Sequence, residues 1–208
     1  MKKLVILLMA ILFLVAVTGT ANAVPLPSGS AVIPGGTTSL GGDVLTSLVV
    51  PFLGVAGGIA GTVTQTVLSN ATGILFEYVI FSSSSSTITQ ASASFFNGFT
   101  TDADGPIFPY TPNVDLITRG IDGETVTWGY IGDAIRLGES SGTLWVQTNA
   151  PTYALGQFAL IGSDTATINM YAPNSGPINP VPEPASMSLL GIGLVGIVAR
   201  KLRKRSRA

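Results

Sequence analysis

Asp102 and Asp104 are separated by one residue and are followed by Gly105. This spacing is typical of the first ligands in a calcium-binding loop. Carboxylate oxygens suit Ca²⁺, but the common calcium loop also needs ligands at later fixed positions and a bidentate Glu at its end. Asn113 stands where that Glu would be, so the complete loop is absent. Two interpretations stay open: a looser calcium site at Asp102 and Asp104, with Asp115 as a further candidate ligand, or two solvated aspartates in a turn, which the neighbouring glycine favours.

Paired carboxylates carry out glycoside hydrolysis, and Glu77, Glu124 and Glu139 are the candidates in the central part of the chain. The two carboxyl groups must lie about 5–5.5 Å apart in a retaining enzyme and about 6.5–9.5 Å apart in an inverting one, and sequence spacing fixes neither distance. The chain has no His and no Cys, which excludes Ser–His nucleophilic pairs and imidazole or thiolate metal ligands. We therefore expect no enzymatic activity and no cofactor, with glycoside cleavage as a remote alternative.

Trp128 and Trp145, with Tyr130 and Tyr153, are candidates for an aromatic platform that stacks on sugar rings. Exposed rings would support carbohydrate binding, with Trp128 and Trp145 as the ligand contacts. Aromatic side chains in strands more often pack in the core, where they bury a large apolar area. The sequence leaves both interpretations open.

Charge is distributed unevenly along the chain. Residues 24–181 carry ten acidic side chains and only two basic ones, Arg119 and Arg136, whereas the other basic residues lie near the two ends. An acidic region repels the phosphates of nucleic acids, so nucleic acid is excluded as a partner. A modest acidic excess is typical of a protein that stays soluble outside the cell.

Short alternating segments indicate β-strands. Residues 74–81 are apolar on both faces apart from Glu77, which predicts a strand covered on both sides. Residues 123–131 place Val126, Trp128 and Tyr130 on one face with polar residues between them, the pattern of a half-buried strand. Residues 142–150 alternate in the same way.

Turn residues divide these segments. Gly162-Ser163 predicts a hairpin between residues 153–161 and 164–171. The serine run at 82–86 predicts a turn after which residues 87–95 pair back as a hairpin. Residues 98–113 are predicted as a loop, and residues 44–60 as two buried segments broken at Pro51 and nearby glycines. Short strands without a convincing amphipathic helix predict an all-β fold, either an antiparallel β-sandwich or a jelly-roll-like domain.

The first 23 residues have the layout of a secretory signal peptide. Lys2 and Lys3 precede an apolar core at 4–17, and Ala21-Asn22-Ala23 offers a small-x-small cleavage site. Cleavage after Ala23 makes Val24 the first mature residue. An uncleaved membrane anchor is the alternative.

The C-terminal end combines Pro182-Glu183-Pro184, an uncharged apolar run at 185–199 and a basic end. A helix over this run is about 22 Å long, short for a bilayer core of about 30 Å, so snorkelling basic side chains or local thinning must make up the difference. Positive charge beside an apolar segment marks the cytoplasmic side of a membrane. The membrane-orienting residues are Arg200, Lys201, Arg203, Lys204, Arg205 and Arg207.

This order of Pro-Glu-Pro, glycine-containing apolar run and basic terminus resembles the PEP-CTERM sorting signal. The resemblance covers about the last 27 residues, from Val181 onward. It implies processing at Pro182, Glu183 and Pro184 by an exosortase, an integral-membrane transpeptidase-like enzyme of Gram-negative bacteria. It also implies export to the cell surface or matrix, often alongside exopolysaccharide production. An ordinary single-pass anchor is the alternative.

The predicted organisation is therefore a signal peptide at 1–23, a Pro/Gly/Ser-rich leader at 24–42, a β-sandwich at 43–171, a linker at 172–181 and the sorting signal at 182–208. The expected partners are the Sec translocon, signal peptidase, the exosortase and an exopolysaccharide. The expected precursor is held by one helix in the bacterial inner membrane, with its ectodomain in the periplasm. The expected function is that of a non-enzymatic surface or matrix protein; a carbohydrate-binding module and a calcium-dependent adhesin are the alternatives.

Overall fold

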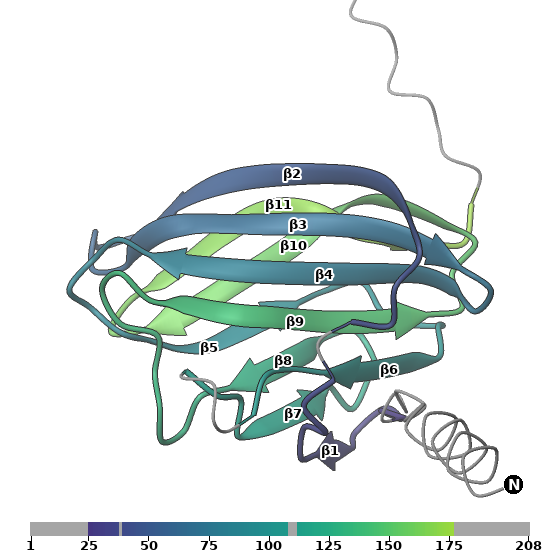
Figure 1. Ribbon diagram of the computed structural model, residues 1–208, viewed down its shortest axis with the longest axis horizontal. Coiled ribbons are helices and arrows are strands. Elements are labelled where there is room, and N and C mark those ends of the chain that lie inside the picture. The colour runs from purple at the N-terminus through teal and green to yellow at the C-terminus, as the bar shows by residue number, and fades with distance from the viewer. Residues whose placement is uncertain (1–24, 38, 108–111, 177–208) are drawn as a thin grey trace, which may run out of the picture. The chain divides into compact units, whose positions relative to one another are not determined.

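The computed structural model describes residues 25–37, 39–107 and 112–176, and every helix or strand among them is a β-strand (Figure 1). In chain order these strands are β1 (Ala31–Val32), β2 (Asp43–Leu53), β3 (Ala60–Asn70), β4 (Gly73–Ser82), β5 (Ile88–Ala93), β6 (Thr101–Asp104), β7 (Leu116–Arg119), β8 (Val126–Gly129), β9 (Ser140–Thr148), β10 (Thr152–Gly162) and β11 (Thr165–Asn174).

The strands form two antiparallel sheets packed face to face (Figure 1). The five-stranded sheet has the order β2-β3-β4-β9-β6, and the six-stranded sheet has the order β1-β7-β8-β5-β10-β11. The predicted all-β antiparallel class is thus confirmed. The signal peptide predicted at 1–23 and the helix predicted at 185–199 lie outside the described residues.

Aromatic side chains fill the space between the sheets. Tyr78 of β4 stacks on Phe158 of β10, with ring centroids 4.7 Å apart, and also contacts Trp128 of β8 at 5.8 Å. Val126, Trp128 and Tyr130 are all buried, as their alternation predicts. Burial raises the pKa of the Tyr78 phenol, because a charged phenolate is disfavoured in an apolar core.

A buried amide ties the two sheets together. Gln65 of β3 faces the core, and its Nε2 donates to the carbonyl of Tyr171 while its Oε1 accepts the Tyr171 N–H, both at 2.7 Å. Tyr171 lies on β11, the edge strand of the opposite sheet. The side chain therefore satisfies two backbone groups of an edge strand as a neighbouring strand would.

Residues 33–37 and 39–42, which we call the strap, cross the outer face of the five-stranded sheet. The backbone N–H groups of residues 35–37 bond to Asp104 on β6, and the Thr37 carbonyl accepts from Trp145 on β9. Farther along, Ser39 bonds to Glu77 on β4. Leu40 packs on a small apolar cluster of Leu68, Leu75 and Trp145. The strap therefore covers the outer face of β4 at Leu75 and Glu77, whereas Phe81 farther along that face is exposed.

Three local predictions were wrong. Residues 87–95 do not pair back on β4, whose edges are occupied by β3 and β9; β5 instead crosses to the other sheet and pairs with β8 and β10. Residues 98–113 are not all loop, since they contain β6. Pro51 does not interrupt the strand. It lies inside β2, an edge strand, where a missing N–H leaves no ladder bond unmade.

The predicted hairpin about Gly162-Ser163 is confirmed, since β10 and β11 pair along their whole length. Asp164 follows this turn and reaches the β2–β3 loop, where its Oδ2 accepts from Ala56 N at 2.8 Å and from Gly58 N at 3.0 Å. Its Oδ1 accepts from Thr165 N at 2.7 Å. One carboxylate thus joins a turn of one sheet to a turn of the other.

Candidate functional site

The two tryptophans proposed as sugar contacts are buried, each with no exposed surface. Trp128 lies in the core, and its Nε1 donates to the Asp104 carbonyl at 3.2 Å. Trp145 lies beneath the strap, and its Nε1 donates to the Thr37 carbonyl at 2.7 Å. Tyr130 is buried as well. The interpretation of these three residues as an aromatic platform is therefore wrong. Their rings are packed inside the fold and offer no stacking face to a ligand.

The Asp104 carboxylate holds the strap in place. Its Oδ1 accepts from Gly35 N at 2.7 Å and Gly36 N at 3.2 Å, and its Oδ2 accepts from Thr37 N at 2.9 Å. Gly105 N adds a further bond at 2.8 Å, and the side chain is fully buried. Asp104 is therefore not a solvated turn residue, which was one of the two interpretations. Its oxygens also accept from backbone N–H groups, whereas the other interpretation, a calcium site, needs them as ligands.

Asp102 lies beside Asp104 on β6 but does not join it in a cluster of ligands. Burial raises the pKa of the Asp102 carboxyl, which disfavours the charged form that a cation would bind. Within residues 25–37, 39–107 and 112–176, no three His, Cys, Asp or Glu side chains are grouped so as to hold a metal ion.

The three glutamates each support a different loop. Glu77 bonds to Ser39 of the strap, the Oε1 of Glu124 accepts from Phe95 N at 3.0 Å, and the Oε2 of Glu139 accepts from Arg136 N at 2.8 Å. Glu77 and Asp104 flank Trp145 in the sheet register. They therefore stand two strands apart, about 10 Å at the usual strand spacing, with an indole between them.

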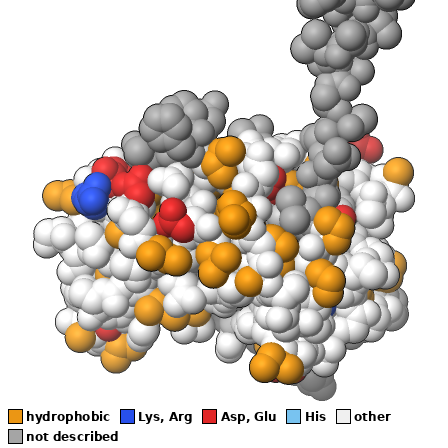
Figure 2. Space-filling view, turned by 90° about the horizontal axis from the view of Figure 1, so that it is seen from below, with side chains coloured by type: hydrophobic (Ala, Val, Ile, Leu, Met, Phe, Trp, Pro, Cys, Tyr) orange, Lys and Arg blue, Asp and Glu red, His pale blue; other side chains and the backbone are white. Residues whose placement is uncertain are grey.

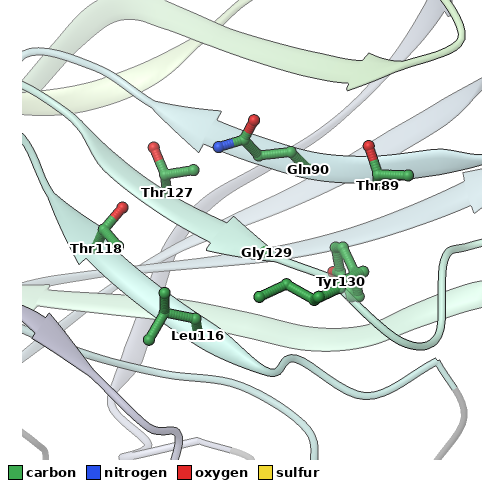
Figure 3. Close-up of a pocket in the computed structure, with 8 residues that line it drawn as sticks. Thr89, Gln90, Leu116, Thr118, Thr127, Gly129 and Tyr130 are labelled. Carbon is green, nitrogen blue, oxygen red and sulfur yellow. The ribbon is translucent and has the colours of Figure 1, made fainter.

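A groove that the sequence did not reveal lies on the outer face of the six-stranded sheet, with a volume of about 350 Å³. Gln90 of β5, Gly129 of β8 and Leu116 of β7 are in register across three neighbouring strands. Because Gly129 has no side chain, a gap opens between Gln90 and Leu116 (Figure 3). The full lining is Thr89, Gln90, Leu116, Thr118, Thr127, Gly129, Tyr130 and Ile131.

No charged side chain lines this groove. Arg119 is the only charged residue in the six strands of this sheet, and its guanidinium points inward. There it donates to the carbonyls of Leu26, Phe96, Phe99 and Gly123 at 2.8–3.2 Å. Burial lowers the pKa of Arg119. The outer face of this sheet is therefore polar through hydroxyl and amide groups alone.

Sequence reasoning missed the groove because it assigned the inward residues of 123–131 and left the outward ones unexamined. Thr127 and Gly129 alternate with the buried Val126 and Trp128. A strand glycine often marks a place where something approaches the backbone closely. That signal is present in the sequence, but only the pairing of β8 with β5 and β7 shows which side chains surround it.

Charged side chains are absent from the groove lining, but the Asp115 carboxylate stands next to it, since it accepts from Gly132 N at 2.9 Å and Gly132 follows the lining residue Ile131. Figure 2 shows blue and red side chains close together at one end of the face in view, with orange side chains scattered among white ones. Arg136, the exposed basic residue of the described part of the chain, lies 3.7 Å from Asp133. An exposed pair of this kind contributes only about 0–1 kcal/mol.

Among the residues that the structure describes, no helix has the length and apolar character needed to span a bilayer. The predicted membrane segment at 185–199 is not among them. The evidence for sorting therefore comes from sequence comparison and not from the coordinates.

A β domain that ends in a C-terminal processing signal defines the class of exported proteins sorted through their C-terminus. The family model of the PEP-CTERM protein-sorting motif matches residues 180–204. The chain is accordingly a PEP-CTERM sorting domain-containing protein. No curated protein and no solved structure matches the chain.

The motif has direct implications for how the protein is processed and where it is sent. It implies an exosortase as the processing partner and a secreted protein with a membrane-anchored precursor. The matched residues include Pro182, Glu183 and Pro184. It does not cover the β domain, so the role of that domain has to be argued from its own surface.

Proposed function

We propose that this protein is a non-enzymatic component of the cell surface or extracellular matrix, associated with exopolysaccharide and delivered by its C-terminal signal. The observation that carries the proposal is the PEP-CTERM motif at 180–204. The proposed route begins with the Sec translocon and with signal peptidase, which cuts after Ala23. The precursor is held in the inner membrane through residues 185–199, and exosortase processing at Pro182–Pro184 then passes it to the surface or the medium.

The β domain supports a structural role. The side chains best suited to chemistry are engaged in holding the fold: Asp104 bonds the strap, Glu124 bonds Phe95 N, and Trp145 bonds the Thr37 carbonyl. A side chain that is hydrogen-bonded to the backbone is held in one position, and a charged group is held most strongly. Such groups support a scaffold.

The proposal is tested by mass spectrometry of the protein recovered from membrane, surface and medium fractions of its native host. We expect the exported protein to begin at Val24 and to end near Pro184. A double variant, Pro182→Ala with Pro184→Ala, should accumulate in the membrane fraction with an intact tail. Pro177→Ala, which lies outside the matched motif, is the control and should be processed normally.

An intact C-terminus at Ala208 in every fraction would contradict the sorting part of the proposal. Its non-enzymatic part is tested separately, by incubating the protein with the host exopolysaccharide and measuring new reducing ends. Release above the rate of a heat-inactivated sample would overturn that part.

Carbohydrate binding is the second candidate function, and the groove over Gly129 is the observation that favours it. Its lining of hydroxyl, amide and apolar groups without charge is suited to neutral polar ligands. This candidate no longer rests on Trp128 and Trp145, which are buried.

A further inference from the structure

We propose that the groove over Gly129 binds a neutral, hydroxyl-rich glycan. This inference gives the matrix association proposed above a location on the β domain, and to that extent it rests on the proposed function. It is argued from the shape of the groove, from its free hydrogen-bonding groups and from the absence of charge.

The groove has the size of a ligand site and a simple structural origin. Its volume of about 350 Å³ falls within the ~300–1,000 Å³ range usual for ligand pockets. Gly129 forms the floor, and the nearest heavy atom to a Cβ placed there is the Leu116 carbonyl oxygen at 3.6 Å. A Cβ at this position would make an ordinary van der Waals contact, so a small side chain is accommodated without displacing the backbone.

Three polar side chains of the groove lining have no hydrogen-bond partner among the described residues, and one of them, the Tyr130 hydroxyl, is buried in the core. The other two, the Gln90 amide and the Thr118 hydroxyl, are half-buried. They flank the floor, since Gln90 lies on β5 and Thr118 on β7 (Figure 3). An amide and a hydroxyl both donate and accept, and this dual capacity matches that of sugar hydroxyl groups.

The other two threonines of the groove are held in place by the protein. Thr127 Oγ1 bonds to Ser92 Oγ at 2.8 Å, and Thr89 Oγ1 donates to the Ile161 carbonyl at 3.3 Å. A hydroxyl that already has one partner keeps a remaining lone pair or proton at a fixed position. The groove thus combines two free polar groups with two positioned ones.

Leu116 and Ile131 supply apolar surface at the side of the groove, and Ile131 is 80% exposed. Sugar rings present C–H faces as well as hydroxyls, so a lining of apolar and neutral polar groups complements them. A charged ligand would lose hydration here without gaining a counter-ion, which is costly. The chemistry therefore favours a neutral glycan over an acidic one.

The test measures binding of the full-length protein, purified in detergent, to two neutral probes and one acidic probe. Dextran and cellohexaose are the neutral probes, alginate is the acidic one, and calorimetry follows the titration. We expect measurable affinity for at least one neutral probe and none for alginate. Gly129→Val fills the floor with a residue that strands favour and should weaken binding at least tenfold with no loss of melting temperature.

Thr118→Val removes a free hydroxyl at nearly constant volume and should weaken binding about fivefold. It keeps the proposal testable if Gly129→Val fails to fold. The matched control is Thr167→Val, the same change at an exposed position of β11 on the same sheet but outside the groove. This control should bind as the wild type does.

Binding to neither neutral probe, equal binding by wild type and both groove variants, or binding to alginate alone would overturn the proposal. So would self-association of the wild type that Gly129→Val abolishes, because the groove would then hold a second copy of the chain. These results leave C-terminal processing untouched, and a failure of processing leaves the titration untouched. The two proposals therefore fail separately.

Discussion

The outer faces of the two sheets differ in both charge and cover. The strands of the five-stranded sheet contain four carboxylates, Asp43, Glu77, Asp102 and Asp104, and the strap lies across this face. The strands of the six-stranded sheet contain one charged residue, Arg119, which is buried. In one sheet Glu77 and Asp104 bind the strap, whereas the other sheet keeps a neutral outer face.

This difference separates two uses of polar residues. A buried carboxylate with several N–H donors fixes one conformation, because each bond to a charged group is strong and its loss leaves donors unsatisfied. Exposed threonine, glutamine and asparagine side chains fix little and remain available to solvent or ligand. The face that holds the strap is thus the structural one, and the uncovered neutral face is the candidate for binding.

The largest effect is expected at Arg119, the single cation in the strands of the six-stranded sheet. Arg119→Leu should lower the free energy of unfolding by about 4 kcal/mol, since several buried carbonyls lose their donor together and each unsatisfied buried group costs about 1–3 kcal/mol. Chemical denaturation measures the change. Arg136→Leu, at an exposed position, is the control and should change stability by less than about 0.5 kcal/mol. Similar small effects for both variants would mean that the cation does not hold this end of the fold.

Removal of the strap's anchor is expected to have the next largest effect. Asp104→Ala should destabilise the protein by about 3 kcal/mol, because the N–H groups of residues 35–37 lose an ionised acceptor. Asp43→Ala provides the comparison on the same sheet, at an exposed strand end. Protease digestion followed by mass spectrometry should show cleavage within residues 33–42 only in Asp104→Ala. Full protection of that segment would show that the remaining contacts, at Trp145, Glu77 and Leu40, hold the strap without Asp104.

Asp164 connects the two sheets, and its effect depends on pH. Bonds from Gly58 N, Thr165 N and Ala56 N lower the pKa of this carboxyl from its ordinary value of 3.8. A lowered folded-state pKa stabilises the protein above pH 3.8, and this contribution is lost as the pH falls through the folded-state pKa. Asp164→Asn should therefore be less stable than wild type at pH 7, and the difference should shrink towards pH 2. A difference that is constant over this range would contradict the assignment.

The smallest effect is expected on the neutral face itself. Thr167→Lys adds a charge at an exposed position and should change the free energy of unfolding by less than about 0.5 kcal/mol. Thermal melting measures this change, and Thr66→Lys, on the outward side of β3, is the comparison on the other sheet. A large loss at Thr167 would indicate that the neutral composition serves stability, and the functional interpretation of this face would lose its basis.

Local patterns in the sequence predicted the strands well where one face is buried. The alternation of Val126, Trp128 and Tyr130 identified the core side of β8, and Gly162-Ser163 identified the last hairpin. In both cases neighbouring residues decide the outcome. The resemblance of the C-terminal end to a sorting signal was equally local, and the family model confirms it.

Long-range partners decided the features that the sequence did not predict. Asp104 has the neighbours of a turn aspartate, but its carboxylate is fixed by residues almost seventy positions earlier. The sequence pattern fits Trp145 equally well as a surface or a core residue. It is buried because the strap covers it. The groove required the register of β5, β8 and β7, which no single segment contains.

The strap also sets an order of events for a chain that crosses a membrane. Its anchors lie far downstream, Asp104 on β6 and Trp145 on β9. A chain that emerges N-terminus first therefore carries its opening residues undocked until most of the domain has followed. Contacts of such long sequence separation form late and slowly. The strap is thus expected to be among the last segments of the domain to dock, after β6 and β9 have formed.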